Sequence, residues 1–261
     1  MGNPMNILAI GDVCGEGGLK IAAKHLFALK KLYNVHLCIV NGENASMKGI
    51  MPAQAQTLLD NGADIITLGN HAWHKRDIVS TLENNGRVIR PLNYAAPLPG
   101  NGFCIVYSPS GKRICVTNLL GRLEMNDIST ESPFWRVNRL FNEAEFDILV
   151  VDFHAEATSE KLAMAYHLDG RAAVLFGTHT HVPTADERIF PKGLGYITDV
   201  GMTGPIESVL GAKPEQSLNY FLGQLPQRFD PAPGDCKLQG ALFEIDENTG
   251  RCIGVKRIEV T

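Results

Sequence analysis

The chain has 261 residues, of which 44% are hydrophobic and 20% are charged, and its formal net charge is −4. These values are ordinary for a globular protein, and the length suits one large α/β domain or two small ones. The acidic balance argues against a protein that binds duplex nucleic acid, because such proteins carry a concentrated basic face. No apolar run approaches the roughly 18 residues that a membrane span needs.

The six cysteines are scattered and form no Cys-x-x-Cys pair. Four of them lie in apolar, strand-like runs, at Cys38, Cys104, Cys115 and Cys252. A free thiol in such a run packs as a small hydrophobe. We therefore expect no disulfide framework and place the protein in a reducing cytoplasm. The N-terminal residues lack the basic and apolar regions of a signal peptide. We expect Met5 to be the natural start, with residues 1–4 as an extension.

Strand and helix patterns alternate in the first third of the chain. Apolar runs predict buried strands at 6–10, 36–40 and 64–68. Helical patterns lie between these strands, over 19–32 and 52–61. A Gly-rich turn at 15–18 is expected before the first helix, and Gly62 is a typical stop after the second. The β-α-β-α-β order predicts parallel pairing through right-handed crossovers.

The remainder of the chain adds hairpins to this pattern. We expect strands at 103–107, 113–118, 147–151, 172–176, 195–198, 240–245 and 252–260, and a helix over 134–145. The first two of these strands and the last two are each joined by a typical hairpin turn. Parallel units with antiparallel hairpins predict two sheets packed face to face with helices outside. The Pro-rich stretch 226–234 is interpreted as an ordered surface loop, so residues 1–261 are taken as one domain.

Polar residues follow five of the predicted strands directly. They are Asp12, Glu43 with Asn44, Asn70 with His71, His154, and His179 with His181. In open α/β sheets, ligands bind at this edge. Two-residue spacing in an extended chain would place His179 and His181 on one face. Each residue alone has an ordinary structural role, as a turn residue or a hydrogen-bonded core histidine. Five clusters at one edge favour a shared metal site.

This ligand set constrains the chemistry of the predicted site. Carboxylate, amide and imidazole groups without a thiolate suit Mn, Fe or Zn more than copper. Seven candidate ligands are too many for one tetrahedral zinc and fit two octahedral ions that share a carboxylate. Two ions roughly 3.5–4 Å apart can hold a hydroxide and clamp both ends of a phosphoryl displacement. Phosphoester hydrolysis is therefore the leading reaction class. The chain has neither a P-loop nor a Gly-x-Ser-x-Gly elbow.

Six motifs resemble one known family in order and content. They are Gly11–Val13, Asn41–Ala45, Gly69–His71, Asp152–Lys161, Gly177–His181 and Tyr196–Met202. Together they resemble the YmdB-type branch of the calcineurin-like metallophosphoesterases, from Met5 to Val260. Gly-Asn-His marks only the superfamily, whereas the long motifs around His154 and His179 are specific to this branch. The resemblance implies a four-layer α/β/β/α sandwich of two packed mixed sheets, with a dinuclear iron or manganese centre. It also implies hydrolysis of 2′,3′-cyclic nucleotides to 3′-nucleotides.

The resemblance also assigns ligands. The first metal ion would be held by Asp12, Asn44 and His181, and the second by Asn70, His154 and His179. Glu43 would bridge the two ions. The wider superfamily has a histidine where this chain has Cys14, which leaves Asn44 to complete the coordination of the first ion. The thiol of Cys14 as a soft ligand is the less favoured alternative.

The resemblance also makes His71 the general acid that would protonate the departing ribose oxygen after attack by a metal-bridging hydroxide. The alternative role is an electrostatic contact with phosphate. The family commonly reads Asn-His-x-Trp-Asp, but His74 stands here in place of the aspartate, so His71 can be tuned differently. We expect His74 to lie beside the site and not to bind metal. Asp199 either accepts a ring N–H from a ligand histidine or has a structural role, in which it caps a helix or braces a loop.

The sequence therefore predicts a two-metal phosphodiesterase whose partners are small cyclic nucleotides or phosphoesters. It names no substrate-binding residue and leaves a homo-oligomer possible in principle. Two alternatives stay open. One is a broad-specificity phosphomonoesterase or phosphodiesterase that uses the same centre. The other is a metal-containing regulatory protein that binds nucleotides and has only vestigial activity. The aromatic residues Phe134, Trp135 and Phe141 are expected in the core, packed from one helix.

Overall fold

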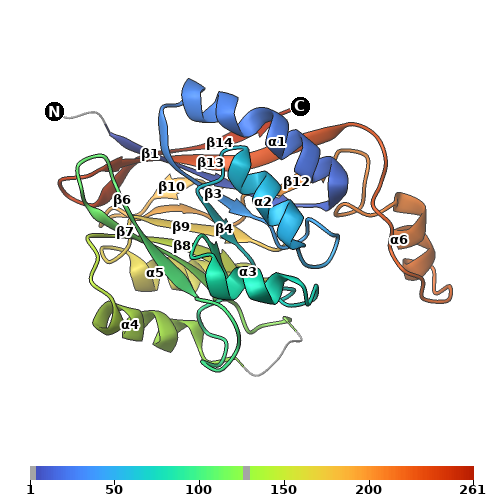
Figure 1. The fold of residues 1–261 in the computed structure, drawn as a ribbon, viewed down its shortest axis with the longest axis horizontal. Coiled ribbons are helices and arrows are strands. Elements are labelled where there is room, and N and C mark those ends of the chain that lie inside the picture. Colours follow the sequence, from blue (N-terminus) through green and yellow to red (C-terminus); the bar gives the residue numbers. More distant parts are fainter. Residues whose placement is uncertain (1–3, 126–129) are drawn as a thin grey trace.

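The computed structural model describes residues 4–125 and 130–261 of the chain, and two β-sheets pack face to face in it (Figure 1). Helices cover the outer side of each sheet (Figure 1). The predicted four-layer α/β/β/α sandwich is therefore confirmed. Residues 1–3 of the expected N-terminal extension lie outside the described part.

The larger sheet contains β1 (Met5–Ile10), β2 (Asp12–Val13), β3 (Val35–Asn41), β4 (Ile65–Thr67), β5 (Val88–Ile89), β12 (Met202–Pro205), β13 (Cys236–Asp246) and β14 (Arg251–Val260). The smaller sheet contains β6 (Phe103–Tyr107), β7 (Arg113–Leu120), β8 (Ile148–His154), β9 (Val174–Thr178), β10 (Arg188–Ile189) and β11 (Gly195–Ile197). The helices are α1 (Gly15–Leu32), α2 (Pro52–Asp60), α3 (Ile78–Asn84), α4 (Pro133–Glu143), α5 (Thr158–Leu168) and α6 (Pro214–Phe221).

Each sheet has a parallel centre. In the larger sheet the order is β2-β12-β13-β1-β3-β4-β5, with β14 on β13, and β1, β3, β4 and β5 run parallel. In the smaller sheet the order is β10-β11-β9-β8-β7-β6, and β7, β8, β9 and β11 run parallel. Parallel strands end at one edge of their sheet, so the loops that follow them gather there. The hairpins β6–β7 and β13–β14 are antiparallel, as predicted.

Alternation along the strands explains why both faces of each sheet are apolar. On β1, Ile7 and Ala9 join the core between the sheets, whereas Leu8 and Ile10 face the helices of the outer layer. Side chains of consecutive strand residues point to opposite faces, so a strand covered on both sides reads as a continuous apolar run. The helix α1 completes the outer layer with a buried stripe that includes Leu26.

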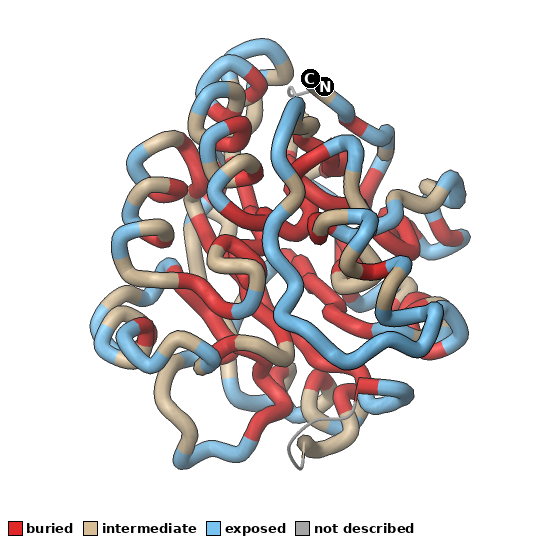
Figure 2. Tube along the Cα trace, turned by 90° about the vertical axis from the view of Figure 1, so that its right-hand side faces the viewer, coloured by how far each residue is buried: buried red, intermediate tan, exposed pale blue. Residues whose placement is uncertain are grey.

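The strand β8 repeats this arrangement in the smaller sheet. Ile148 and Val150 lie in the core between the sheets, and Leu149, Val151 and Phe153 pack in the cluster that includes buried residues of α4 and α5. Because side chains along a strand alternate between its two faces, Asp152 and His154 lie on the same face as Ile148 and Val150. Two polar side chains therefore enter the space between the sheets at the end of β8. The tube in Figure 2 shows buried segments in the interior and exposed turns outside.

Some details of the predicted elements were wrong. The helix α1 begins at Gly15, so the Gly-rich stretch is its first turn and not a separate turn before it. The physical reason is packing, because a Cβ on Gly18 would overlap the carbonyl of Thr203. Trp135 is 71% exposed and lies outside the core. Phe134 and Phe141 pack against the core, as expected. The sequence analysis also missed α3, α5 and α6.

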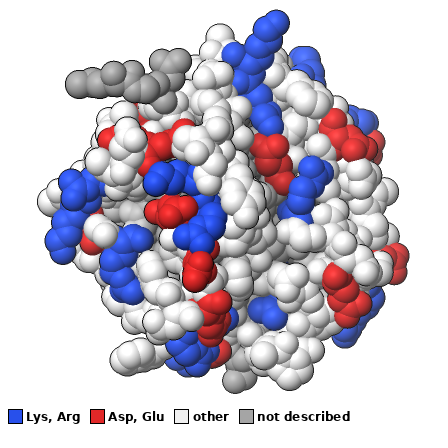
Figure 3. Space-filling model, turned by 60° about the vertical axis from the view of Figure 1, so that its left-hand side comes forward, with Lys and Arg blue, Asp and Glu red and all other residues white. Residues whose placement is uncertain are grey.

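The chain between β12 and β13, residues 206–235, forms an arm that carries α6. In Figure 1 α6 stands away from the two sheets. Residues 221–230 are exposed throughout, which places the Pro-rich stretch on the surface as expected. Within the described part of the chain, no helix is both long and apolar enough for a membrane crossing. On the face in Figure 3, acidic and basic side chains are interspersed and form no broad basic field.

The layered core predicts a large difference between inner and outer apolar residues. Phe243 is fully buried on β13 between the sheets, and Leu225 is 91% exposed on the arm. We expect Phe243→Ala to lower the free energy of unfolding by about 3–5 kcal/mol because it leaves a cavity. Leu225→Ala should change it by less than about 0.5 kcal/mol. Urea unfolding of both variants measures the difference, and equal losses would contradict the assigned core.

Candidate metal centre

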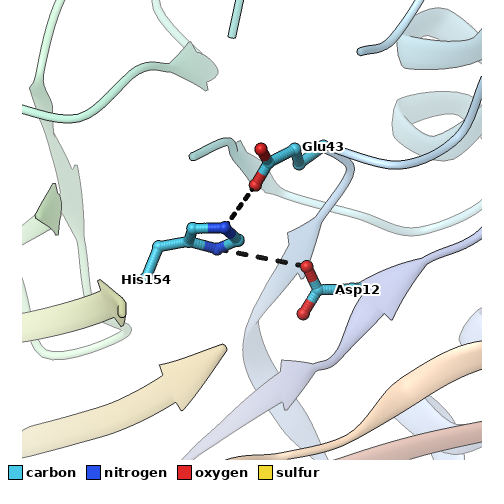
Figure 4. Close-up of side chains that lie close together, drawn as sticks. All are labelled: Asp12, Glu43 and His154. Atoms are coloured by element: carbon cyan, nitrogen blue, oxygen red, sulfur yellow. Dashed lines mark ion pairs between the residues drawn. The ribbon is translucent and has the colours of Figure 1, made fainter. Parts of the chain in front are cut away.

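Three buried side chains from different elements meet at the carboxyl edge of the two sheets. Asp12 comes from β2, Glu43 from the loop after β3, and His154 from the last residue of β8 (Figure 4). All three are fully buried, and one ligand atom from each lies within 4.8 Å of the others. In Figure 4 the imidazole of His154 lies between the two carboxylates. This cluster has the residue types and spacing to hold a metal ion.

Two further predicted ligands, His179 and Asn70, approach Nε2 of His154, the nitrogen that also faces Glu43. This Nε2 lies 2.6 Å from Glu43 Oε2, 3.0 Å from His179 Nδ1 and 3.2 Å from Asn70 Oδ1. The far side of the His179 ring is occupied, because its Nε2 lies 3.2 Å from Glu156 Oε2. The inner nitrogen of His179 is therefore Nδ1, and it faces His154.

The other three predicted ligands form a second group. Asp12 Oδ1 lies 3.6 Å from His181 Nε2 and 3.5 Å from Asn44 Nδ2, and this Asn44 atom is 3.1 Å from His181 Nε2. His181 Nδ1 lies 3.1 Å from the carbonyl oxygen of Leu210, which can only accept a hydrogen bond. The proton is thus held on Nδ1, and Nε2 is left facing Asp12. A rotation of the Asn44 amide would present its oxygen there instead.

The backbone at the two neighbouring histidines differs from the prediction. The chain at 179–181 is not extended, because His179 has φ 100° and His181 has φ 63°. Both values are uncommon for residues with a side chain. The two imidazoles still reach the site, so the expected convergence occurs through a tight left-handed turn and not through strand alternation. Such strained positions concentrate at functional sites.

A buried polar network that the sequence analysis did not identify orients His154. The Thr178 hydroxyl donates to Asp152 Oδ1 at 2.7 Å, so it can accept from His154 Nδ1, which lies 2.8 Å away. This fixes the proton of His154 on Nδ1 and leaves Nε2 for the site. The other oxygen of Asp152 accepts from Thr67 at 2.5 Å and from Asn41 at 3.1 Å. The signal in the sequence was a carboxylate two residues before His154, on the same strand face.

The charges in this group are strongly coupled. Burial would raise the pKa of Glu43, but the charges and hydrogen bonds of His154 and His71 outweigh it and hold that pKa far below its ordinary value. Burial would lower the pKa of His154, yet Glu43, Asp12 and Asp152 raise it to about 9. Burial, together with the charge of His154, lowers the pKa of His179 to about 3. The raised pKa of His154 shows that the surrounding carboxylates favour positive charge at its ring, and a metal ion bound at Nε2 would supply that charge in place of a second proton.

The contacts of His154 Nε2 and Glu43 Oε2 show whether these residues fit a metal ion. Nε2 of His154 carries at most one hydrogen, so it cannot satisfy the three polar atoms that lie within 3.2 Å of it. Glu43 Oε2 is buried, and apart from its 2.6 Å contact with His154 Nε2 it has no hydrogen-bond partner among the described residues. Lone pairs of carboxylate, amide and imidazole groups thus converge without enough protons between them. A metal ion with oxygen and nitrogen ligands satisfies such a set.

Asp199 has the loop-bracing role of the two that were considered. Its Oδ2 accepts from Thr180 N–H and the Thr180 hydroxyl, and its Oδ1 accepts from the backbone N–H of Gly201. It also forms a fully buried ion pair with Lys161, with 2.8 Å between Lys161 Nζ and Asp199 Oδ2. Burial raises the pKa of Asp199 even though Lys161 opposes this shift. The pair holds the turn that carries the two histidines.

His71 lies beside the cluster on the side of Glu43. Its backbone N–H donates to Glu43 Oε1 at 2.5 Å, and its ring Nδ1 is 3.0 Å from the same oxygen. The side chain is 24% exposed, so it borders the solvent side of the site. His74 meets His71 edge-on, with 5.8 Å between ring centroids, and is exposed. Gly69 supports this arrangement, because a Cβ there would overlap Glu43 and His154.

Cys14 lies at the rim of the cluster but has other contacts. Its sulfur is 3.7 Å from the sulfur of Met47 and 3.9 Å from the carbonyl oxygen of Leu210. Burial, and then the charge of Asp12, raises the pKa of this thiol to about 12. A thiol in that state is a poor ligand, because metals bind the thiolate. The oxygen and nitrogen ligands therefore remain the better set.

The fold and the site together are those of a metallophosphoesterase-like protein. A family model described as YmdB-like protein matches residues 8–258, and the chain belongs to this family. It is 42% identical over 257 residues to the 2′,3′-cyclic-nucleotide 2′-phosphodiesterase of Bacillus subtilis, covering 97% of this chain and 96% of that protein.

Two crystal structures are closely similar to this chain. One is a protein of Mycoplasma pneumoniae described as a novel phosphatase, with a TM-score of 0.94, 38% identity, and coverage of 100% of this chain and 94% of that one. The other is a hypothetical protein of Thermus thermophilus, with a TM-score of 0.92, 39% identity, and coverage of 98% and 99%. The predicted family resemblance is therefore confirmed.

The buried pair of Lys161 and Asp199 predicts a measurable asymmetry. Lys161→Met leaves a buried carboxylate without its cation and should lower the free energy of unfolding by about 3–5 kcal/mol. The double variant Lys161→Met/Asp199→Asn removes both charges and should recover part of that loss, because the amide oxygen still accepts hydrogen bonds. Urea unfolding compares the two. A double variant no more stable than the single one would refute this account of the pair.

Proposed function

We propose that this protein is a two-metal phosphodiesterase that hydrolyses small 2′,3′-cyclic nucleotides to 3′-nucleotides. One observation carries the proposal: two groups of three potential ligands lie at one edge, and a carboxylate oxygen of Glu43 lies within 4.8 Å of ligand atoms from both groups, Asp12 of one and His154 of the other. The names of the relatives support the broader class, a phosphoric-ester hydrolase. The name of the Bacillus subtilis relative supports the cyclic-nucleotide substrate.

The ligands divide between two ions. We assign Asp12, Asn44 and His181 to the first ion, and Asn70, His154 and His179 to the second, with Glu43 shared between them. The separate contacts within each group support this division. When bound, the two ions would supply a nucleophilic hydroxide and neutralise the phosphate oxygens. Iron is our first choice and manganese the second, because oxygen and imidazole ligands suit both.

The residues of the chain have complementary roles in this reaction. Asp152 and Thr178 hold the ring of His154 in one tautomer, and Leu210 does the same for His181. Pre-orientation of this kind reduces reorganisation during the reaction. Glu43 fixes His71 at the exposed border of the site through its backbone and its ring. There His71 would donate a proton to the departing ribose O2′, which leaves poorly as an alkoxide.

A phosphomonoesterase with the same centre is the alternative enzyme, and a nucleotide-binding regulator is the alternative outside enzymes. The partly exposed His71 beside the cluster favours an enzyme that must protonate a leaving group. We further propose that residues 1–261 act as one domain, because both sheets contribute to the core between them. The six free cysteines support placement in the reducing cytoplasm.

The acid role of His71 predicts an effect that depends on the leaving group. His71→Ala should lower kcat for 2′,3′-cyclic AMP by about 10²- to 10⁴-fold, the usual contribution of a general acid. Bis-p-nitrophenyl phosphate should lose far less, because nitrophenolate leaves without a proton. Metal content measured on the same samples separates this effect from lost ions, and His167→Ala on α5 serves as the control. Equal losses for both substrates would point to an electrostatic contact with phosphate.

The division of ligands predicts a metal stoichiometry. Metal analysis of the purified protein should give two ions per chain, and chelation should abolish turnover until Mn²⁺ or Fe²⁺ is added. His154→Ala and His181→Ala should each retain about one ion, because they belong to different groups. A wild-type content of one ion, removed entirely by either substitution, would contradict the two-ion assignment. His25→Ala, a histidine on α1, is the matched control.

A further inference from the structure

A cavity of about 780 Å³ lies between the arm and the loops that carry part of the centre. Its walls come from residues 46–48, from His74 and Lys75, and from the arm residues 209, 210, 212, 217, 220, 221 and 227–229. The volume lies within the range of small-molecule sites. The arm, whose helix α6 stands away from the two sheets in Figure 1, forms one side of the cavity.

Three contacts join this cavity to the metal centre. The carbonyl oxygen of Leu210, which lines the cavity, lies 3.1 Å from Nδ1 of His181. His74 meets the ring of His71 edge-on. Met47 donates its backbone N–H to the carbonyl oxygen of Asn44 at 2.7 Å. The cavity therefore adjoins the centre through residues that contact His181, His71 and Asn44.

The cavity is basic although the whole chain is acidic. Lys48, Lys75 and Arg228 line it, and no aspartate or glutamate does. Within residues 4–125 and 130–261, none of these three cations forms an ion pair within 4.0 Å. The chain as a whole carries a formal net charge of −4. Unpaired cations gathered at a cavity without acids favour an anionic ligand.

Three aromatic side chains of the arm also line the cavity. Tyr220 is 52% exposed, Phe221 is 79% exposed and Phe229 is 39% exposed. The rings of Tyr220 and Phe229 meet edge-on, with 6.1 Å between their centroids. Exposed aromatic rings beside cations are the combination that binds single-stranded nucleic acid, because bases stack on the rings and phosphates pair with the cations.

We infer that the cavity binds the nucleotide that precedes a terminal 2′,3′-cyclic phosphate, so that the preferred substrates are short single-stranded oligoribonucleotides with such ends. This inference rests on the proposed function. A cyclic phosphate at the centre occupies the 2′,3′ edge of the ribose, which leaves the 5′ side to extend outward. The 5′-phosphate would meet Lys48, Lys75 and Arg228, and the preceding base would stack on the aromatic wall.

The reaction itself is unchanged by this extension. Water adds to the cyclic phosphodiester, the bond between phosphorus and O2′ breaks, and O2′ receives a proton. The product is an oligonucleotide with a 3′-phosphate and a free 2′-hydroxyl. The cavity contributes only binding energy on the 5′ side of the scissile bond.

Three substrates test the inference with the metal-loaded full chain. They are adenosine 2′,3′-cyclic phosphate, the same compound with a 5′-phosphate, and the dinucleotide ApA with a terminal 2′,3′-cyclic phosphate. We expect kcat/KM to be about 10- to 100-fold higher for the second than for the first, because its 5′-phosphate can form charge-assisted hydrogen bonds with the cations of the cavity. The dinucleotide should gain further through stacking. The preference should weaken as salt increases.

Matched variants assign the preference to the cavity. Lys48→Gln/Lys75→Gln/Arg228→Gln should reduce the ratio between the first two substrates to about one. Lys31→Gln/Lys192→Gln/Arg87→Gln, an equal change of charge away from the cavity, should keep the ratio. Tyr220→Ala/Phe221→Ala should remove the additional gain of the dinucleotide. Circular dichroism and metal content show that each variant is folded and loaded.

The outcomes separate this inference from the proposed function. If the wild type does not turn over any of the three substrates, the proposed function itself is wrong. If it hydrolyses adenosine 2′,3′-cyclic phosphate but shows no preference for a 5′-phosphate, only the inference about the cavity is wrong. A preference that survives in the Lys48/Lys75/Arg228 variant would likewise overturn the assignment of the cavity.

Discussion

The carboxylate of Asp152 is the constraint on which the site depends. It is fully buried between the sheets, and it accepts hydrogen bonds from Thr67 and Asn41 of the larger sheet and from Thr178 of the smaller one. A buried carboxylate is costly unless such donors surround it. The donors are available only if the two sheets pack with their carboxyl edges together. The network thus favours the one packing of the sheets that also assembles the metal ligands.

The position of this network explains why the ligands come from distant parts of the chain. The larger sheet contributes Asp12 and the loops after β3 and β4, whereas the smaller sheet contributes His154 and the turn after β9. Neither sheet alone supplies all seven predicted ligands. Glu43 spans the boundary, because it comes from the larger sheet and approaches His154 of the smaller one. The centre is therefore a property of the packed pair of sheets.

The sequence was sufficient for the layers and for the position of the site. Continuous apolar runs such as 148–151 predicted strands buried on both faces, and the polar residues after them predicted the edge at which a ligand would bind. Local geometry was out of reach. The left-handed turn at His179 and His181 follows from tertiary contacts, among them the pair of Lys161 and Asp199, that no spacing rule encodes. Trp135 was misplaced because consecutive helix residues are rotated by about 100° around the axis, so Trp135 does not share the buried face with Phe134.

The histidine at position 74 connects the centre and the cavity. The family that the chain resembles commonly has an aspartate at this position. Here His74 lines the cavity together with Lys48 and Lys75. A carboxylate at this position would face both lysines and pair with them. Burial, followed by the charges of His71 and the two lysines, lowers the pKa of His74, and a histidine in either protonation state offers the lysines no negative charge. The cations therefore stay free for an anion. One residue beside His71 thus changes the charge of the adjoining cavity while leaving every predicted metal ligand in place.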